Sequence, residues 1–130
     1  MPASKYDAQI DTYIDEQGLG EHVHIGNYTH DDIPDLMALS QVVIYTTIGS
    51  EPFGLVPVEG MACGVPVVVT NSGGMVDSVS DGETGFIISR DETRMPGELA
   101  DRIVELLAAR LTEFQLSATK PNLCPTKNNR

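Results

Sequence analysis

Hydrophobic residues recur along the chain in two patterns, which predict alternating helices and strands. A spacing of three and four residues is typical of helices, whereas two-residue alternation or an unbroken β-branched run is typical of strands. Helices are expected over residues 4–17, 29–40, 55–63, 75–82 and 96–111. Strands are expected over 22–28, 41–47, 65–70 and 85–89, and the second and third of these have the composition of strands buried on both faces.

Strands that alternate with helices over short connections indicate a parallel sheet covered on both sides. We therefore expect an α/β fold, with a partial Rossmann-like parallel sheet of about four strands flanked by helices. A chain of 130 residues has room for one domain, which we place at residues 1–111. Residues 112–130 lose the periodicity and collect Pro, Asn, Thr and Lys, so a disordered tail is expected there.

The charge of the chain limits the ligands that it can bind. The formal net charge is −11, and no Lys or Arg occurs between Lys5 and Arg90. Nucleic acid is therefore not expected as a partner, because phosphate neutralisation requires a basic surface. An anionic ligand held by the centre of the chain must rely on backbone N–H groups, on helix N-termini or on basic groups from elsewhere.

Other features of the composition point to an ordinary intracellular domain. No apolar run approaches the roughly 18–20 residues that span a bilayer, so no transmembrane segment is expected. The first residues lack the apolar centre of a secretory signal, and we expect a cytoplasmic protein. Two cysteines make neither a disulfide framework nor a metal motif, so Cys63 is expected to be a buried free thiol and no metal site is predicted.

Three loops are expected at one edge of the sheet, where ligands of open parallel sheets bind. They are residues 26–28, 49–54 and 71–74. The second loop leads into EPFGLVPVE, which has Glu51 and Glu59 at its two ends. If Gly54 caps the helix, the N–H groups of Gly54, Leu55 and Val56 are left for a phosphate or a sugar hydroxyl.

The two glutamates of this segment fit two contacts to different parts of one ligand. A carboxylate that accepts from two adjacent hydroxyl groups is suited to a ribose or another sugar. Two glutamates at this spacing are also common on ordinary helix surfaces, so spacing alone leaves a functional and a structural interpretation open.

The stretch SEPFGLVPVEGMACGVPVVVTNSGGMVDSVSDGETGF strongly resembles one family. It is similar to the C-terminal nucleotide-sugar-binding domain of GT-B glycosyltransferases of family 4, the retaining "group 1" transferases. The paired glutamates, the PFG bend, the G-x-P-V-V strand, the GG loop and the DG-x-T-G turn occur in the family's order, and the resemblance covers about residues 6–88.

The resemblance implies a role for each matching residue. Glu51 corresponds to the catalytic glutamate beside the transferred sugar, and Glu59 to the glutamate that binds the ribose of the donor. The other donor-binding positions that it implies are Phe53, Gly54, Leu55, Gly26, Asn27, Tyr28, Gly73 and Gly74. The expected ligand is a nucleotide sugar, which is a substrate, and no cofactor or metal is implied.

The family also has parts that this chain does not match. Its donor domain begins with two further strands and a basic pair that neutralises the diphosphate, and its acceptor is bound by a separate N-terminal domain. We therefore expect the isolated chain to be inactive, and a homodimer or a complementary chain to cover its exposed sheet edges. Three functions stay open: a glycosyltransferase completed by another part, a nucleotide- or sugar-binding module without turnover, and a self-associating fragment without a ligand.

Overall fold

The computed structural model describes residues 5–111, which contain a three-stranded parallel sheet in the order β1-β2-β3. The strands are β1 (Val43–Tyr45), β2 (Val67–Thr70) and β3 (Gly85–Ile88). Val67 lies opposite Val43 on one side and opposite Gly85 on the other. The predicted class, an α/β fold with a parallel sheet flanked by helices, is confirmed.

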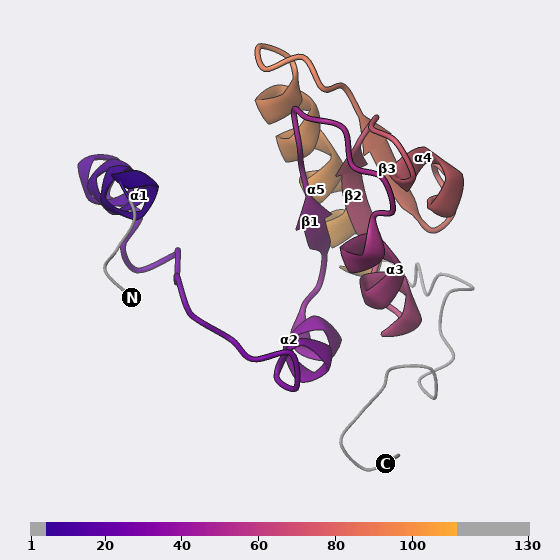
Figure 1. Cartoon of the computed structure of the whole chain (residues 1–130), viewed down its shortest axis with the longest axis horizontal. Coiled ribbons are helices and arrows are strands. Elements are labelled where there is room, and N and C mark those ends of the chain that lie inside the picture. Colours follow the sequence, from indigo (N-terminus) through magenta and orange to yellow (C-terminus); the bar gives the residue numbers. More distant parts are fainter. Residues whose placement is uncertain (1–4, 112–130) are drawn as a thin grey trace.

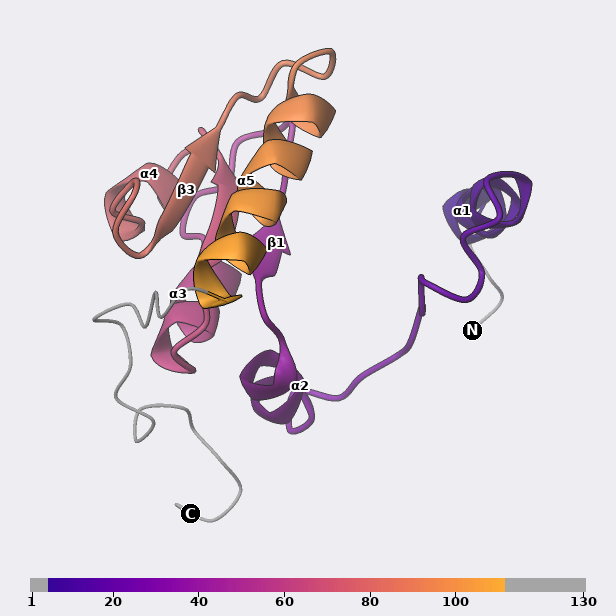
Figure 2. The same ribbon diagram turned by 180° about the vertical axis from the view of Figure 1, so that it is seen from behind.

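Helices lie on both faces of this sheet, as Figures 1 and 2 show from opposite sides. The helices are α1 (Lys5–Glu16), α2 (Ile33–Leu39), α3 (Leu55–Ala62), α4 (Met75–Ser78) and α5 (Met95–Leu111). Successive side chains of β2 point to opposite faces, so Val67 and Val69 pack with Met75 of α4, while Val68 packs with Leu106 of α5. All four residues of β2 are buried, which explains why its first three residues are valines.

The structure does not form the strand expected over residues 22–28. This segment is exposed and irregular, and it connects α1 to α2 at a distance from the sheet (Figure 1). A strand needs a neighbour for its backbone N–H and C=O groups, and the described residues supply none here. The strand predicted over residues 22–28 was therefore wrong, and the described residues contain three strands where about four were expected, although Val23 and Ile25 alternate in the sequence.

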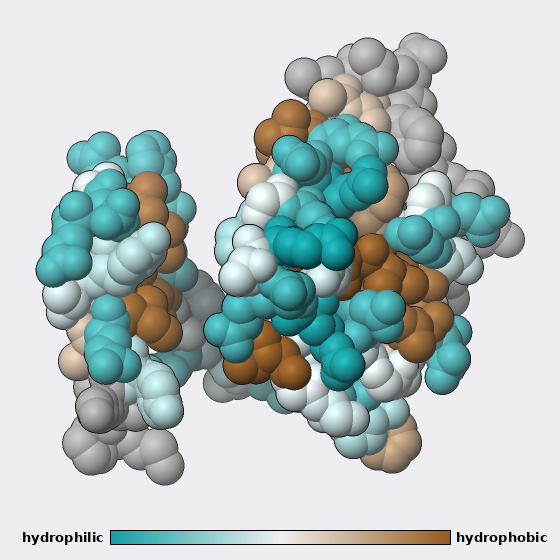
Figure 3. Space-filling view, turned by 90° about the horizontal axis from the view of Figure 1, so that it is seen from above, coloured by the Kyte–Doolittle hydropathy of each residue, from teal (hydrophilic) through white to brown (hydrophobic). Residues whose placement is uncertain are grey.

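Helix α1 stands apart from the rest of the molecule with an uncovered apolar side. Tyr6, Ile10 and Tyr13 recur at helical spacing and are all exposed. Hydrophobic atoms of α1 gather on the side that faces the sheet-bearing part (Figure 3). The described residues place nothing against this side, so the helical pattern was predicted correctly but its packing partner is absent from this part of the chain.

The other expectations concern Cys63, the tail and a membrane-spanning segment. Cys63 is half-buried and disulfide-bonded, so the prediction of a buried free thiol was wrong. The tail predicted at residues 112–130 lies outside the described residues. Between residues 5 and 111, no helix is both long enough and apolar enough to cross a bilayer.

Candidate functional site

The loops at residues 49–54 and 71–74 meet at the carboxyl ends of β1 and β2 and form the candidate site. Their backbones are joined by two hydroxyl side chains, one at the end of the buried strand β2 and one just beyond it. Thr70 is fully buried; its Oγ1 accepts from the Thr47 N–H (2.9 Å) and donates to the Thr47 carbonyl (3.0 Å). Ser72 is 2% exposed; its Oγ accepts from the Glu51 N–H (3.1 Å) and donates to the Gly49 carbonyl (2.7 Å). These side chains therefore continue the β1–β2 connection beyond the end of the sheet.

The glycine loop lies directly against the bend at residues 51–53. The Gly74 N–H donates to the Glu51 carbonyl (3.0 Å). A Cβ on Gly73 would overlap the Glu51 carbonyl oxygen, and a Cβ on Gly74 would overlap that of Pro52. Gly73 also has a φ of +46°, which disfavours any residue with a side chain. The two glycines are thus required for the close approach of the two backbones.

The Glu51 carboxylate is held at the start of α3. Its Oε1 accepts from the N–H groups of Gly54 (3.3 Å) and Phe53 (3.4 Å), and its Oε2 accepts from the Tyr45 hydroxyl (3.0 Å). The bonds from Gly54, Tyr45 and Phe53 lower the pKa of the Glu51 carboxyl below its ordinary value of 4.5, because they stabilise the ionised form. The same hydrogen bond, followed by partial burial and the carboxylate charge, raises the pKa of Tyr45.

This arrangement corrects one detail of the predicted site. Gly54 is the N-cap of α3, as expected, and its φ of +61° turns the chain into the helix. Its N–H is not free, however, because the Glu51 carboxylate already accepts from it. The amide groups at the start of α3 that follow Gly54, those of Leu55 and Val56, have no acceptor inside the helix. A ligand at this end of α3 therefore meets an ionised carboxylate beside backbone donors.

Most of the predicted site residues lie together at this edge. Glu51 contacts Gly54, Gly73 and Gly74 through the loops described above. Phe53 is 75% exposed, and Leu55 is also exposed at the first position of α3. Glu59 is half-buried one turn further along the same helix. Its carboxylate has no hydrogen-bond partner among the described residues, unlike that of Glu51.

The structure does not bring the third predicted loop to this edge. Gly26, Asn27 and Tyr28 lie in the exposed segment between α1 and α2, apart from the sheet. This segment has no strand neighbour among the described residues, and none of them holds it against the loops that follow β1 and β2.

Sequence reasoning missed three residues that build the site, namely Tyr45, Thr70 and Ser72. Each had a signal in the sequence. Tyr45 lies within the β-branched run at 41–47 and is the last residue of β1. The two hydroxyl residues lie at and just beyond the end of the run that becomes β2. Polar side chains directly after a buried strand are well placed to bond a neighbouring loop.

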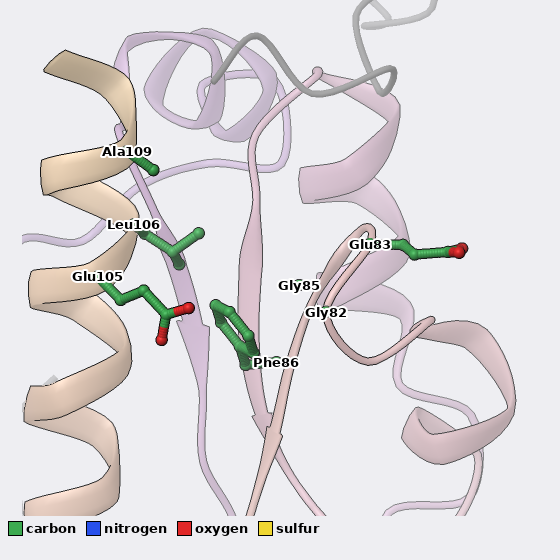
Figure 4. Close-up of a pocket in the computed structure, with 7 residues that line it drawn as sticks. All are labelled: Gly82, Glu83, Gly85, Phe86, Glu105, Leu106 and Ala109. Carbon is green, nitrogen blue, oxygen red and sulfur yellow. The ribbon is translucent and has the colours of Figure 1, made fainter. Parts of the chain in front are cut away.

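A hollow lies between the start of β3 and α5 (Figure 4), and none of the predicted site residues lines it. Its volume is about 190 Å³, below the roughly 300–1,000 Å³ of typical ligand pockets. Apolar groups of Phe86, Leu106 and Ala109 line it, with Glu105 beside them, whereas Glu83 points away. Arg102 lies over the Phe86 ring, 4.6 Å from its centre. Within residues 5–111, no group of acidic, histidine and cysteine side chains could hold a metal ion.

Comparison with known proteins identifies the family. The family model of the glycosyl transferases group 1 matches residues 3–120, nearly the whole chain. This chain belongs to the group 1 glycosyl transferases. The resemblance carried by the EPFG segment, the glycine loop and the turn before β3 is therefore confirmed.

The relatives of this glycosyl transferase chain include two D-inositol 3-phosphate glycosyltransferases. The one from Paenarthrobacter aurescens is 34% identical over 101 residues, which are 77% of this chain and 24% of the relative. The one from Mycobacterium tuberculosis is 39% identical over 94 residues, which are 72% of this chain and 19% of the relative. The match thus spans between about a fifth and a quarter of the length of these proteins.

Solved structures of one protein, crystallised with different ligands, have the same fold. Anabaena Alr3699/HepE in complex with UDP-glucose matches with a TM-score of 0.76 and 32% identity, over 91% of this chain and 31% of that protein. Its complex with UDP matches with a TM-score of 0.72 and the same identity, over 87% of this chain and 29% of that protein.

Proposed function

We propose that this glycosyl transferase chain carries the donor-binding part of a retaining, GT-B type enzyme. A nucleotide sugar binds at the start of α3, between the 49–54 loop and the glycine loop. The observation that supports this most strongly is the Glu51 carboxylate, held at the N-terminus of α3 beside the exposed Phe53 and Leu55. The similarity to Anabaena Alr3699/HepE, solved with UDP and with UDP-glucose, supports the choice of ligand.

The chemistry of the site assigns different parts of the donor to different groups. No Lys or Arg lies between Lys5 and Arg90, so the diphosphate depends on backbone N–H groups of α3 and on its helix dipole. The Glu59 carboxylate accepts from the ribose hydroxyls of the nucleotide. Glu51 lies beside the transferred sugar as the catalytic residue, and an acceptor domain outside this chain supplies the second substrate.

Thermal unfolding with a panel of nucleotides tests donor binding. We expect the midpoint to rise by several degrees with UDP, GDP or ADP, or with a sugar derivative of one of them, because a ligand at a hundred times its Kd adds about 2.7 kcal/mol. The rise should be lost in Glu59→Ala and kept in Glu92→Ala, a matched change at an exposed position away from the site. A panel without any shift, or an equal shift in Glu59→Ala, contradicts the proposal.

A second proposal concerns the open edge of the sheet. Val43 bonds to Pro66 beside β2, so the alternate residue Ile44 directs its N–H and C=O to the side where the described residues place no strand. Ile44 is also 44% exposed, which is high for a β-branched residue in a parallel sheet. A second copy of this chain covers this edge when no other strand is available.

Light scattering at high micromolar concentration tests this pairing. We expect a dimer for the natural chain and a monomer for Ile44→Lys, because a charge on an edge strand opposes pairing. Val104→Lys, which places the same charge at an exposed apolar position of α5, should leave the dimer intact. A natural chain that is monomeric under these conditions is inconsistent with the second proposal.

A further inference from the structure

Tyr45 connects the hydrophobic core to the candidate site. It is the last residue of β1, and its side chain packs against the cluster of Val67, Val69, Met75 and Val79 on the α3–α4 side of the sheet. The aromatic ring is half-buried there, so its two rotatable bonds are constrained by packing. The phenol oxygen at the far end of the ring therefore has a defined position at the carboxyl edge of the sheet.

The Tyr45 hydroxyl bonds to the one oxygen of Glu51 that the backbone does not hold. Oε1 accepts from Phe53 and Gly54, whereas Oε2 accepts from the hydroxyl at 3.0 Å. The Glu51 backbone is fixed in addition, because its N–H donates to Ser72 and its carbonyl accepts from Gly74. With the main chain and Oε1 fixed, the Tyr45 hydroxyl determines how the plane of the carboxylate is turned.

The orientation of this carboxylate decides which part of a ligand it can contact. Hydrogen bonds from three donors favour its ionised form, which is an acceptor only. An ionised carboxylate binds the hydroxyl groups of a sugar and repels a phosphate at the same place. Its contribution is therefore to the sugar part of a nucleotide sugar, and not to the nucleotide part.

We propose that Tyr45 is a positioning residue that turns the Glu51 carboxylate toward the sugar of the donor, and thereby sets the preference for a nucleotide sugar over the bare nucleotide. The proposal rests on the donor-binding function proposed above. Tyr45 is not among the contacts predicted from the sequence, and it acts on the ligand only through Glu51.

The Tyr45→Phe variant tests this proposal, because it removes the hydroxyl and keeps the ring that packs in the core. Tyr13→Phe makes the same chemical change on the exposed side of α1 and serves as the control. The first measurement is an NMR titration of the Glu51 side-chain carboxyl carbon without any ligand. In Tyr45→Phe its pKa should rise toward the ordinary value, because one of the three bonds to the ionised form is lost.

The second measurement compares the affinities for UDP and UDP-glucose by calorimetry. In Tyr45→Phe the affinity for UDP-glucose should fall about 10- to 100-fold, the loss typical of one hydrogen bond to a charged group, while the affinity for UDP stays unchanged. Tyr13→Phe should match the natural chain in both measurements.

Three results would contradict the positioning role of Tyr45 or the donor-binding function on which it rests. An unchanged Glu51 titration in Tyr45→Phe overturns the positioning role whether or not a ligand binds. An equal loss of affinity for UDP and UDP-glucose overturns it too, because it shows a structural effect only. A natural chain that binds neither compound refutes the donor-binding function and the sugar preference with it, and the titration then still decides whether Tyr45 holds Glu51.

Discussion

Replacing Gly73 with alanine is expected to lower the free energy of unfolding by about 2–5 kcal/mol and to abolish nucleotide binding. A left-handed backbone costs a residue with a side chain about 1–2 kcal/mol. Gly73 has a φ of +46°, and its new Cβ would also overlap the Glu51 carbonyl oxygen. Relief of that overlap requires a backbone shift, for which about 1–3 kcal/mol is typical. Because the shift moves Glu51, the site is lost together with the stability.

In a urea unfolding experiment, Gly82→Ala separates the cost of the left-handed backbone from the cost of the overlap. Gly82 has a φ of +80°, but no atom lies within 4 Å of the position that its Cβ would take. This variant should therefore show only the conformational cost of about 1–2 kcal/mol. If Gly73→Ala is no less stable than Gly82→Ala, the close contact between the glycine loop and the Glu51 bend is contradicted.

Thr70→Val is expected to cost about 1–3 kcal/mol, although the two side chains have nearly the same shape. The valine removes the hydroxyl that bonds both the N–H and the carbonyl of Thr47, and leaves these groups beside a fully buried position. A buried polar group without a partner carries a penalty of this size. The loop that carries Glu51 should also loosen, which faster hydrogen exchange of its amides will show.

Thr84→Val is the matched change at a position that water can reach. The Thr84 hydroxyl accepts from the Ser80 N–H (3.0 Å) in an exposed turn, so water can replace the lost bond. The variant should lose no more than about 0.5 kcal/mol. Equal destabilisation in the two variants is the outcome that speaks against Thr70 as a buried anchor of the loop.

The sequence allowed most of the sheet-bearing part to be predicted, because its signals are local. The buried run at 65–70 contains β2, as predicted. Gly54 precedes the start of α3 and Gly64 follows its end, and both have the left-handed conformation that suits glycine at these positions. The final helix begins at Met95, one residue before the predicted start. Helix α4 is shorter than predicted, since it ends at Ser78, and the residues up to Gly82 turn into β3 instead.

The missed features depend on contacts between segments that are distant in the sequence. Alternation at Val23 and Ile25 is a correct strand pattern, but a strand forms only beside another strand, and the described residues place none there. The spacing of Glu51 and Glu59 indicated a ligand site, yet it did not indicate that the first carboxylate bonds to Gly54 and Tyr45. The bond to Tyr45 joins the Glu51 loop to the end of β1, and the two are brought together only in the folded chain.

Mapping UDP-glucose onto the chain by two-dimensional amide NMR tests donor binding at the start of α3 most directly. Binding there predicts shift changes concentrated in residues 53–59 and 72–74, and their loss in Glu59→Ala. Changes confined to the hollow between β3 and α5, or no changes at saturating UDP-glucose, would contradict it.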